Sequence, residues 1–304
     1  MSTQKVPVTF LSGHSPRKGV LGVIAFPDML EGDTTFTRLF GYSNGQWGRG
    51  NDFPFDCRSL SYLADAATGY KAWWLLGKNG EAVEVKGGVP TIEQIPGAGL
   101  NVAHPYGYVS AIKNIQGKLY VCGYGRQVYK RDPPWRSIAD DILTHESAIG
   151  FFDIDGVSDT CIYAVGWQGE IYFLEGQLWR KDDSPTTAHL AAVRCLAPDD
   201  VWICGDKGVV LHGSFNNWRE IRDAGFTGNW YSIEEFAGRI YLAANEGLAW
   251  VDGNAIRPVD VGLKRPITTH RLHARDGLLW SIGEKDILVF DGQVWTEVLH
   301  PDNV

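Results

Sequence analysis

The chain has 304 residues, of which 44% are hydrophobic and 36 are glycine, and its formal net charge is −8. This acidity excludes a general affinity for DNA or RNA, because such binding needs a basic face. No apolar run reaches membrane-spanning length, and the first residues lack the apolar stretch of a signal peptide. We therefore expect a cytoplasmic protein without membrane contact, whose five cysteines remain free thiols.

The first fifty residues predict four short strands. The apolar runs VPVTFLSG, GVLGVIAF and FTRLFGY are followed by NGQWGRG, in which Gly45, Gln46 and Trp47 stand at the fourth run. The last repeat of the chain has a similar ending, Gly292-Gln293-Val294-Trp295. This similarity indicates that residues 6–50 form a first repeat and not an irregular arm.

From residue 58 onward, one pattern recurs with a period of about 40 residues. An aromatic residue marks the second run of each copy, at Trp73, Tyr120, Tyr163, Trp202, Tyr241 and Trp280. The steps between these markers are 47, 43, 39, 39 and 39 residues. Within each copy the apolar positions alternate every two residues, which is the spacing of strands and not of helices. Such a period is the mark of a repeat architecture.

Four antiparallel strands per period with glycine-containing turns predict an all-β, seven-bladed β-propeller. Six blades preceded by an N-terminal arm are the alternative. A closed seven-bladed ring makes residues 1–304 a single domain. The blades that we expect are 6–50, 58–97, 108–140, 148–182, 189–223, 230–261 and 269–299.

The repeats resemble the β-propeller repeat superfamily that includes Asp-box and YVTN-like repeats. The segment FDGQVW (290–295) comes near an Asp-box ending, although the expected serine is missing. No copy has the Gly-His start and Trp-Asp finish of a WD40 repeat. The resemblance therefore implies an architecture and leaves the function to be argued from sites.

Four of the eight histidines fall in or near connections between blades, where a propeller places residues beside its central channel. They are His104, His145, His189 and His270. A symmetric metal site would place each histidine at a similar distance from its marker, but the distances are 16, 18, 13 and 10 residues. The sequence also lacks GxSxG, HExxH and P-loop motifs. We expect no metal, no cofactor and no catalytic residue.

The turns between second and third strands differ most from copy to copy, and they all lie on one face of a propeller. Trp167 stands in such a turn, so we expect it to be exposed; the other copies have Lys78, Tyr124, Asp206, Asn245 and Glu284 at this position. An aromatic pair with a charged rim has the composition of a protein-binding hot spot. The residues that we expect to bind a partner are Tyr124, Arg126, Trp167, Glu170, Lys207, Glu246 and Glu284.

These features favour a non-enzymatic, protein-binding propeller. By analogy with other acidic bacterial binders, we expect an immunity protein that binds and neutralises a cognate toxin, with a basic toxin domain as partner. The alternative is a propeller enzyme, a lyase, hydrolase or metal-dependent oxygenase, with its site at the mouth of the central channel.

Overall fold

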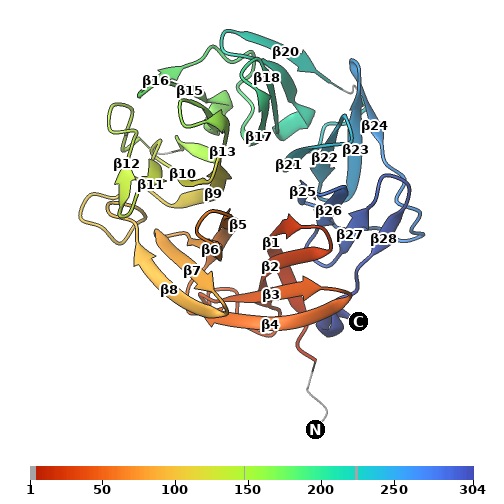
Figure 1. The fold of residues 1–304 in the computed structure, drawn as a ribbon. Helices are drawn as coiled ribbons and strands as arrows, with labels where there is room; N and C mark the ends of the chain where they lie inside the picture. The colour runs from red at the N-terminus through yellow and green to blue at the C-terminus, as the bar shows by residue number, and fades with distance from the viewer. Residues whose placement is uncertain (1–4, 147, 223–224) are drawn as a thin grey trace.

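The computed structural model describes residues 5–146, 148–222 and 225–304, so residue 223, where the fifth blade was expected to end, lies outside the described residues. Seven four-stranded antiparallel sheets form a ring around a central axis (Figure 1). The seven-bladed prediction is confirmed, and the alternative of six blades plus an arm is wrong. Among the described residues, no helix is long and apolar enough to cross a membrane.

Each blade consists of four consecutive strands, counted outward from the axis. The inner strands are β1 (Val8–Arg17), β5 (Cys57–Asp65), β9 (Val109–Ile115), β13 (Phe151–Ser158), β17 (Leu190–Ala197), β21 (Ser232–Phe236) and β25 (Arg271–Arg275). The second strands are β2 (Val20–Pro27), β6 (Tyr70–Gly77), β10 (Lys118–Gly123), β14 (Cys161–Gly166), β18 (Asp200–Gly205), β22 (Arg239–Ala244) and β26 (Leu278–Ile282).

The remaining strands lie toward the rim of the ring. The third strands are β3 (Thr37–Ser43), β7 (Glu81–Lys86), β11 (Val128–Arg131), β15 (Ile171–Glu175), β19 (Val210–Ser214), β23 (Gly247–Asp252) and β27 (Ile287–Phe290). The outer strands are β4 (Gln46–Phe53), β8 (Val89–Gln94), β12 (Trp135–Ser137), β16 (Leu178–Lys181), β20 (Asn217–Ile221), β24 (Ala255–Pro258) and β28 (Trp295–Glu297). Three single-turn 3₁₀ segments complete the described structure: η1 (Trp167–Gly169), η2 (Asp206–Gly208) and η3 (Pro301–Asn303).

The second strands are buried almost without interruption. In β14, the five residues from Ile162 to Gly166 are all buried. The middle of a blade is covered on both faces by its neighbours, so side chains that point to either side must be apolar. This two-sided burial explains why the second runs are nearly continuous apolar stretches, although we expected alternation.

The ring closes between the first and last blades without a blade that mixes strands from both ends of the chain. The backbone N–H of Phe10 donates to the carbonyl oxygen of Glu284 at 2.9 Å. The C-terminal segment, residues 299–304, then lies against the first blade (Figure 1). Asn303 Oδ1 accepts the backbone N–H of Val8 at 2.9 Å, and the indole of Trp47 donates to the carbonyl of Leu299 at 2.9 Å.

His300 fills the apolar part of this contact. Its ring lies 4.5 Å from that of Phe40, 4.6 Å from that of Trp47 and 5.5 Å from that of Phe10, measured between centroids. The side chain is buried, and burial lowers its pKa. The neutral imidazole is therefore the form that the closed ring favours.

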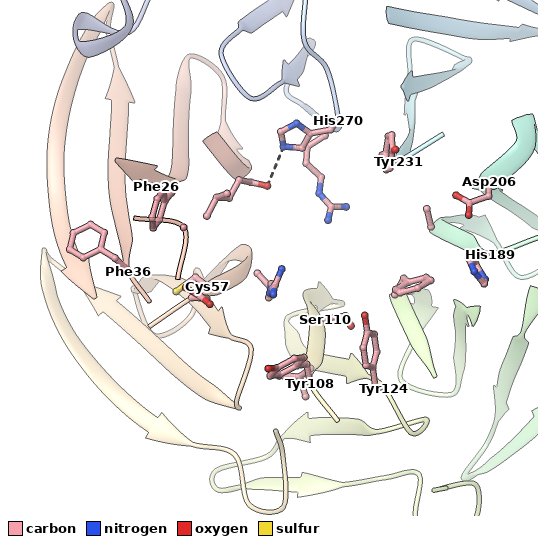
Figure 2. Close-up of a pocket in the computed structure, with 18 of the residues that line it drawn as sticks. Phe26, Phe36, Cys57, Tyr108, Ser110, Tyr124, His189, Asp206, Tyr231 and His270 are labelled. Carbon is pink, nitrogen blue, oxygen red and sulfur yellow. Dashed lines mark hydrogen bonds between the residues drawn. The ribbon is translucent and has the colours of Figure 1, made fainter. Parts of the chain in front are cut away.

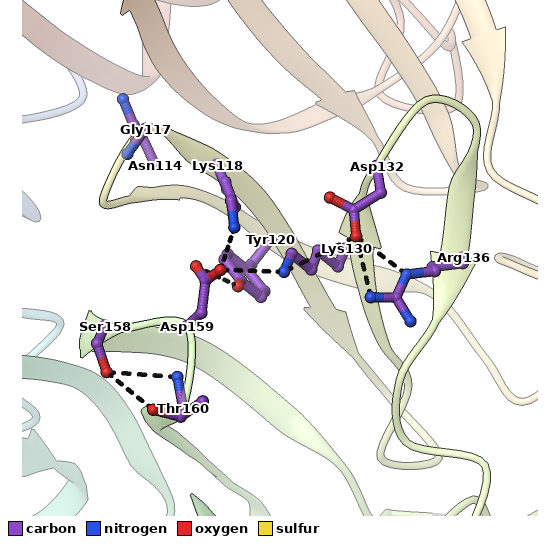
Figure 3. Close-up of polar contacts among 10 residues, drawn as sticks. All are labelled: Asn114, Gly117, Lys118, Tyr120, Lys130, Asp132, Arg136, Ser158, Asp159 and Thr160. Carbon is purple, nitrogen blue, oxygen red and sulfur yellow. Dashed lines mark hydrogen bonds and ion pairs between the residues drawn. The ribbon is translucent and has the colours of Figure 1, made fainter. Parts of the chain in front are cut away.

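On the side of the ring opposite the contact between the first and last blades, charged residues link neighbouring blades. Asp159, in the turn between β13 and β14, accepts hydrogen bonds from Lys118, Tyr120 and Lys130 of the preceding blade (Figure 3). The Tyr120 hydroxyl lies 3.1 Å from Asp159 Oδ1, and Lys130 Nζ lies 3.3 Å from Oδ2. One carboxylate thus connects two blades through three donors.

Acid should weaken ring closure through His300. Folding lowers the pKa of His300. The stability that the neutral ring contributes is therefore complete at a pH above the pKa of the unfolded state, about 6.5, and is lost as the pH falls below that value. We predict that His300→Phe reduces the loss in free energy of unfolding between about pH 7.5 and about pH 5.5, as measured by urea denaturation. His145→Gln, at an exposed position, is the control and should leave that loss unchanged. If wild type and His300→Phe lose the same free energy of unfolding over this pH range, protonation of His300 does not weaken ring closure.

Candidate functional site

A cavity of about 770 Å³ opens at one mouth of the central channel. Its wall comes from the first residues of the inner strands and from the connections between second and third strands. This mouth is on the face that carries the turns expected to bind a partner. We call it the mouth cavity (Figure 2); the aromatic residues that line it are Phe26, Phe36, Tyr108, Tyr124, Phe152 and Tyr231.

Most of these rings were not among the expected binding residues. Tyr108, Phe152 and Tyr231 stand at or just before the start of an inner strand, a position that recurs from blade to blade. Phe36 belongs to the long connection between β2 and β3, which contributes no residue to the expected binding set. The recurring aromatic residue before an inner strand was the available signal, but only the folded ring shows that these residues meet.

Tyr124 and Trp167, the expected aromatic pair, do lie together. Their rings are 5.9 Å apart and cross at 78°, and Trp167 also packs 5.2 Å from Phe152 and 4.5 Å from His189. Trp167 is half-buried, not exposed as we expected, because these neighbouring rings cover part of it. Trp167 therefore supports the wall of the mouth cavity, while Tyr124 lines the cavity directly.

Arg126 and Glu170 are paired with each other. Arg126 of the third blade contacts Glu170 Oε1 of the fourth blade at 2.6 Å and lies over the ring of Tyr172. Glu170 is only 8% exposed, and its Oε2 also accepts the backbone N–H of Gly150 at 3.2 Å. We expected both residues in an exposed rim, but the structure buries Glu170 in an ion pair between blades.

The other three expected residues are exposed on the same face. Lys207 is at the tip of η2, where its backbone N–H donates to Asn229 Oδ1 at 3.2 Å. Glu246 and Glu284 follow the second strands of the sixth and seventh blades. They surround the mouth cavity at a distance and do not line it.

The four candidate histidines do not form one group. His189 and His270 line the mouth cavity, whereas His104 and His145 are exposed outside it, and His145 stacks on Tyr106 at 4.2 Å. The Leu11 carbonyl oxygen lies 3.2 Å from His270 Nε2, and burial together with the nearby Arg271 lowers the His270 pKa to about 4. Within the described residues, no group of three or more His, Cys, Asp or Glu side chains is arranged to hold a metal ion.

Deeper in the channel, charged side chains from neighbouring inner strands are paired. Arg194 lies 2.8 Å from Glu234 and 3.4 Å from Asp155, and Lys113 lies 3.7 Å from Asp153. Asp153 and Asp155 also accept the backbone N–H groups of Val193 and Cys195 on the next inner strand, at 3.1 and 2.9 Å. These carboxylates are buried and hold adjacent blades in register.

The five cysteines are free, as expected, and four of them are buried while Cys161 is half-buried. Burial raises the pKa of Cys161 and of Cys57, the latter to about 12. These thiols are held in their protonated form and are poor nucleophiles. They therefore act as small apolar groups of the core.

The fold and the mouth cavity define a seven-bladed propeller with an aromatic recess at one mouth of its channel. The chain is 35% identical over 228 residues to the immune protein Tsi7 of Pseudomonas aeruginosa, covering 73% of this chain and 74% of that protein. It belongs to the family of that immune protein. No family model matches the sequence.

Solved structures support the architecture alone. The WD40 propeller domain of Doa1 superposes with a TM-score of 0.67 at 10% identity, over 94% of this chain and 93% of that chain. YCF48, solved bound to D1 peptide, gives a TM-score of 0.66 at 14% identity, over 94% of each chain.

The buried ion pair between blades should contribute to stability far more than an exposed one. We predict that Glu170→Gln lowers the free energy of unfolding by at least about 2 kcal/mol, because it leaves the Arg126 guanidinium without its counter-charge. Glu175→Gln in the same blade is the control: Glu175 and Arg180 are both exposed, so its effect should stay within about 0.5 kcal/mol. Similar urea midpoints for the two variants would show that the pair between blades contributes little.

Proposed function

We propose that this protein is an immunity protein that binds a cognate toxin in the cytoplasm and neutralises it without catalysis. The likeness to an immune protein over most of both chains supports this role. The observation that carries the proposal is the mouth cavity. It is a preformed recess of about 770 Å³, lined by aromatic rings and surrounded by turns that differ from blade to blade.

The physics of protein recognition supports this face as the contact surface. Aromatic residues in well-packed recesses dominate binding energy, because they bury a large area at a small cost in side-chain entropy. The Tyr124, Trp167 and Phe152 rings are already packed against one another, so little ordering is needed on binding. A rigid propeller also keeps the recess open in the absence of a partner.

The partner that we propose is a basic toxin domain. The chain has 36 acidic and 28 basic side chains, and Glu246 and Glu284 place exposed carboxylates on the proposed contact face. An acidic surface accelerates encounter with a basic partner and disfavours acidic competitors. The same charge disfavours nucleic acid as a ligand.

Co-expression tests the proposed function. The genes adjacent to the one for this chain are expressed singly in a bacterial host, with and without this chain. We expect one of them to stop growth alone and to be tolerated with this chain, and its product to co-purify as a stable complex. Absence of any toxic neighbour that this chain suppresses would contradict the proposal.

Trp167→Ala should weaken that complex by about 2 kcal/mol, or roughly thirtyfold in Kd, because Tyr124 and Phe152 lose the ring that supports them. Leu178→Ala is the matched control: Leu178 is 59% exposed, but its turn between β15 and β16 lies on the opposite face. Calorimetric titration of the purified toxin domain measures both affinities. Equal weakening by the two variants would place the contact elsewhere.

A further inference from the structure

Two arginines lie in the mouth cavity without a counter-charge. Arg58 is the second residue of β5 and Arg271 is the first residue of β25, so both are at the cavity end of inner strands. Arg271 also lines a second cavity of about 320 Å³ inside the channel and therefore lies where the two cavities join. Within the part of the chain that the structure describes, neither guanidinium has an ion-pair or hydrogen-bond partner.

Three other cations near the axis have acidic partners. Arg194 is paired with Glu234 and Asp155, Lys113 with Asp153, and Lys78 with Asp56 at 2.5 Å. The pairs of Arg194 and Lys113 join inner strands of different blades. Arg58 and Arg271 differ because β5 and β25 flank β1, whose sequence VTFLSGHSPR contains no acidic residue.

The surroundings of these two arginines leave their charge exposed to a ligand. His270 stays neutral near Arg271, since its pKa is lowered to about 4. The carboxylate of Asp56 is already bound by Lys78. Among the described residues, Asp206 on the fifth blade is the one remaining acidic side chain that lines the mouth cavity. The two unpaired guanidinium groups therefore lie on the second and seventh blades, on either side of the first blade.

We infer that Arg58 and Arg271 form a carboxylate-binding site, which receives an Asp or Glu side chain from a loop that the protein partner inserts into the mouth cavity. The guanidinium group matches a carboxylate in shape, can donate two parallel hydrogen bonds to it, and is weakly hydrated. The aromatic wall covers the apolar residues beside that carboxylate and excludes water, which strengthens the charge pair.

This inference rests on the proposed function and refines it. The exposed carboxylates of Glu246 and Glu284 on the outer part of the face favour a basic partner, whereas the recess favours one acidic side chain at the tip of a loop. The partner must then carry both a basic surface and one acidic side chain that enters the recess. A partner that is only basic cannot form the charge pair in the recess and binds more weakly. The site thus provides a specificity that net charge alone cannot give.

The site is tested first on the isolated protein with two peptides, Ac-Phe-Asp-Phe-NH₂ and Ac-Phe-Asn-Phe-NH₂, which differ only in the carboxylate. Each competes against 8-anilinonaphthalene-1-sulfonate, an aromatic anion whose fluorescence reports binding. We expect the Asp peptide to displace the dye at a concentration at least about tenfold lower than the Asn peptide needs. Equal displacement by the two peptides would overturn the inference.

The variant for this test is Arg58→Gln combined with Arg271→Gln, and it should abolish the preference for the Asp peptide. Arg257→Gln, at an exposed arginine on the outer strand β24, is the control and should retain the preference. Circular dichroism and thermal unfolding verify that the double variant is folded, and Arg58→Gln alone, at an exposed position, serves if the double variant is not. A preference that persists in the folded variant would also overturn the inference.

Growth protection separates this inference from the proposed function. If wild type protects against the toxin and the arginine variant protects equally, with unchanged affinity, the carboxylate site is wrong while the immunity role stands. If the peptides behave as expected but no toxin is neutralised, the proposed function fails and the site remains. Loss of protection in the arginine variant, with the Arg257→Gln control still protective, supports both.

Discussion

Closure of the ring between the first and seventh blades is the contact on which the rest of the molecule depends. Each blade is a separate run of four strands, and no strand from one end of the chain completes a blade at the other. The last residues of the chain instead hold the two ends together by packing against the first blade. Asn303 binds Val8, and His300 packs among aromatic rings. If this contact opened, the buried faces of both blades would meet water, and the wall of the mouth cavity would be broken at β1.

The distribution of charge around the axis divides the channel into two regions. In its interior, carboxylates of one blade bind cations and backbone N–H groups of the next, so charge is used to hold the ring together. At the mouth, beside the acid-free strand β1, the guanidinium groups of Arg58 and Arg271 have no such partner among the described residues. A buried charge with a partner serves structure, whereas an accessible charge without one is available to a ligand. The proposed recognition site follows from this difference.

The architecture could be predicted from the sequence because it depends on local features that repeat. The spacing of Trp202, Tyr241 and Trp280 indicates the blades, and the Gly-Gln-Trp segment at Trp47 identified the first one. The candidate site depends on contacts between residues distant in the chain. Arg126 and Glu170 are 44 residues apart, and no short pattern indicates that they form an ion pair.

The burial of Trp167 was missed for the same reason. Its position in a turn predicted exposure, but Phe152 and His189, from neighbouring inner-strand ends, cover its ring. Likewise, the missing partners of Arg58 and Arg271 become visible only when β1 is placed between β5 and β25. A sequence repeat shows the order of the blades around the ring. It does not show which side chains of different blades face one another across the axis.

The central claim is that the face bearing the mouth cavity is the one that receives the partner. Hydrogen exchange of the backbone amides, compared between the free chain and its complex with the toxin domain, tests it most directly. Protection should appear in residues 28–36, 124–126, 167–169 and 206–208 and at the first residues of the inner strands. Protection confined to the opposite face, at residues 175–177 and 291–293, or to the outer strands, would contradict the account.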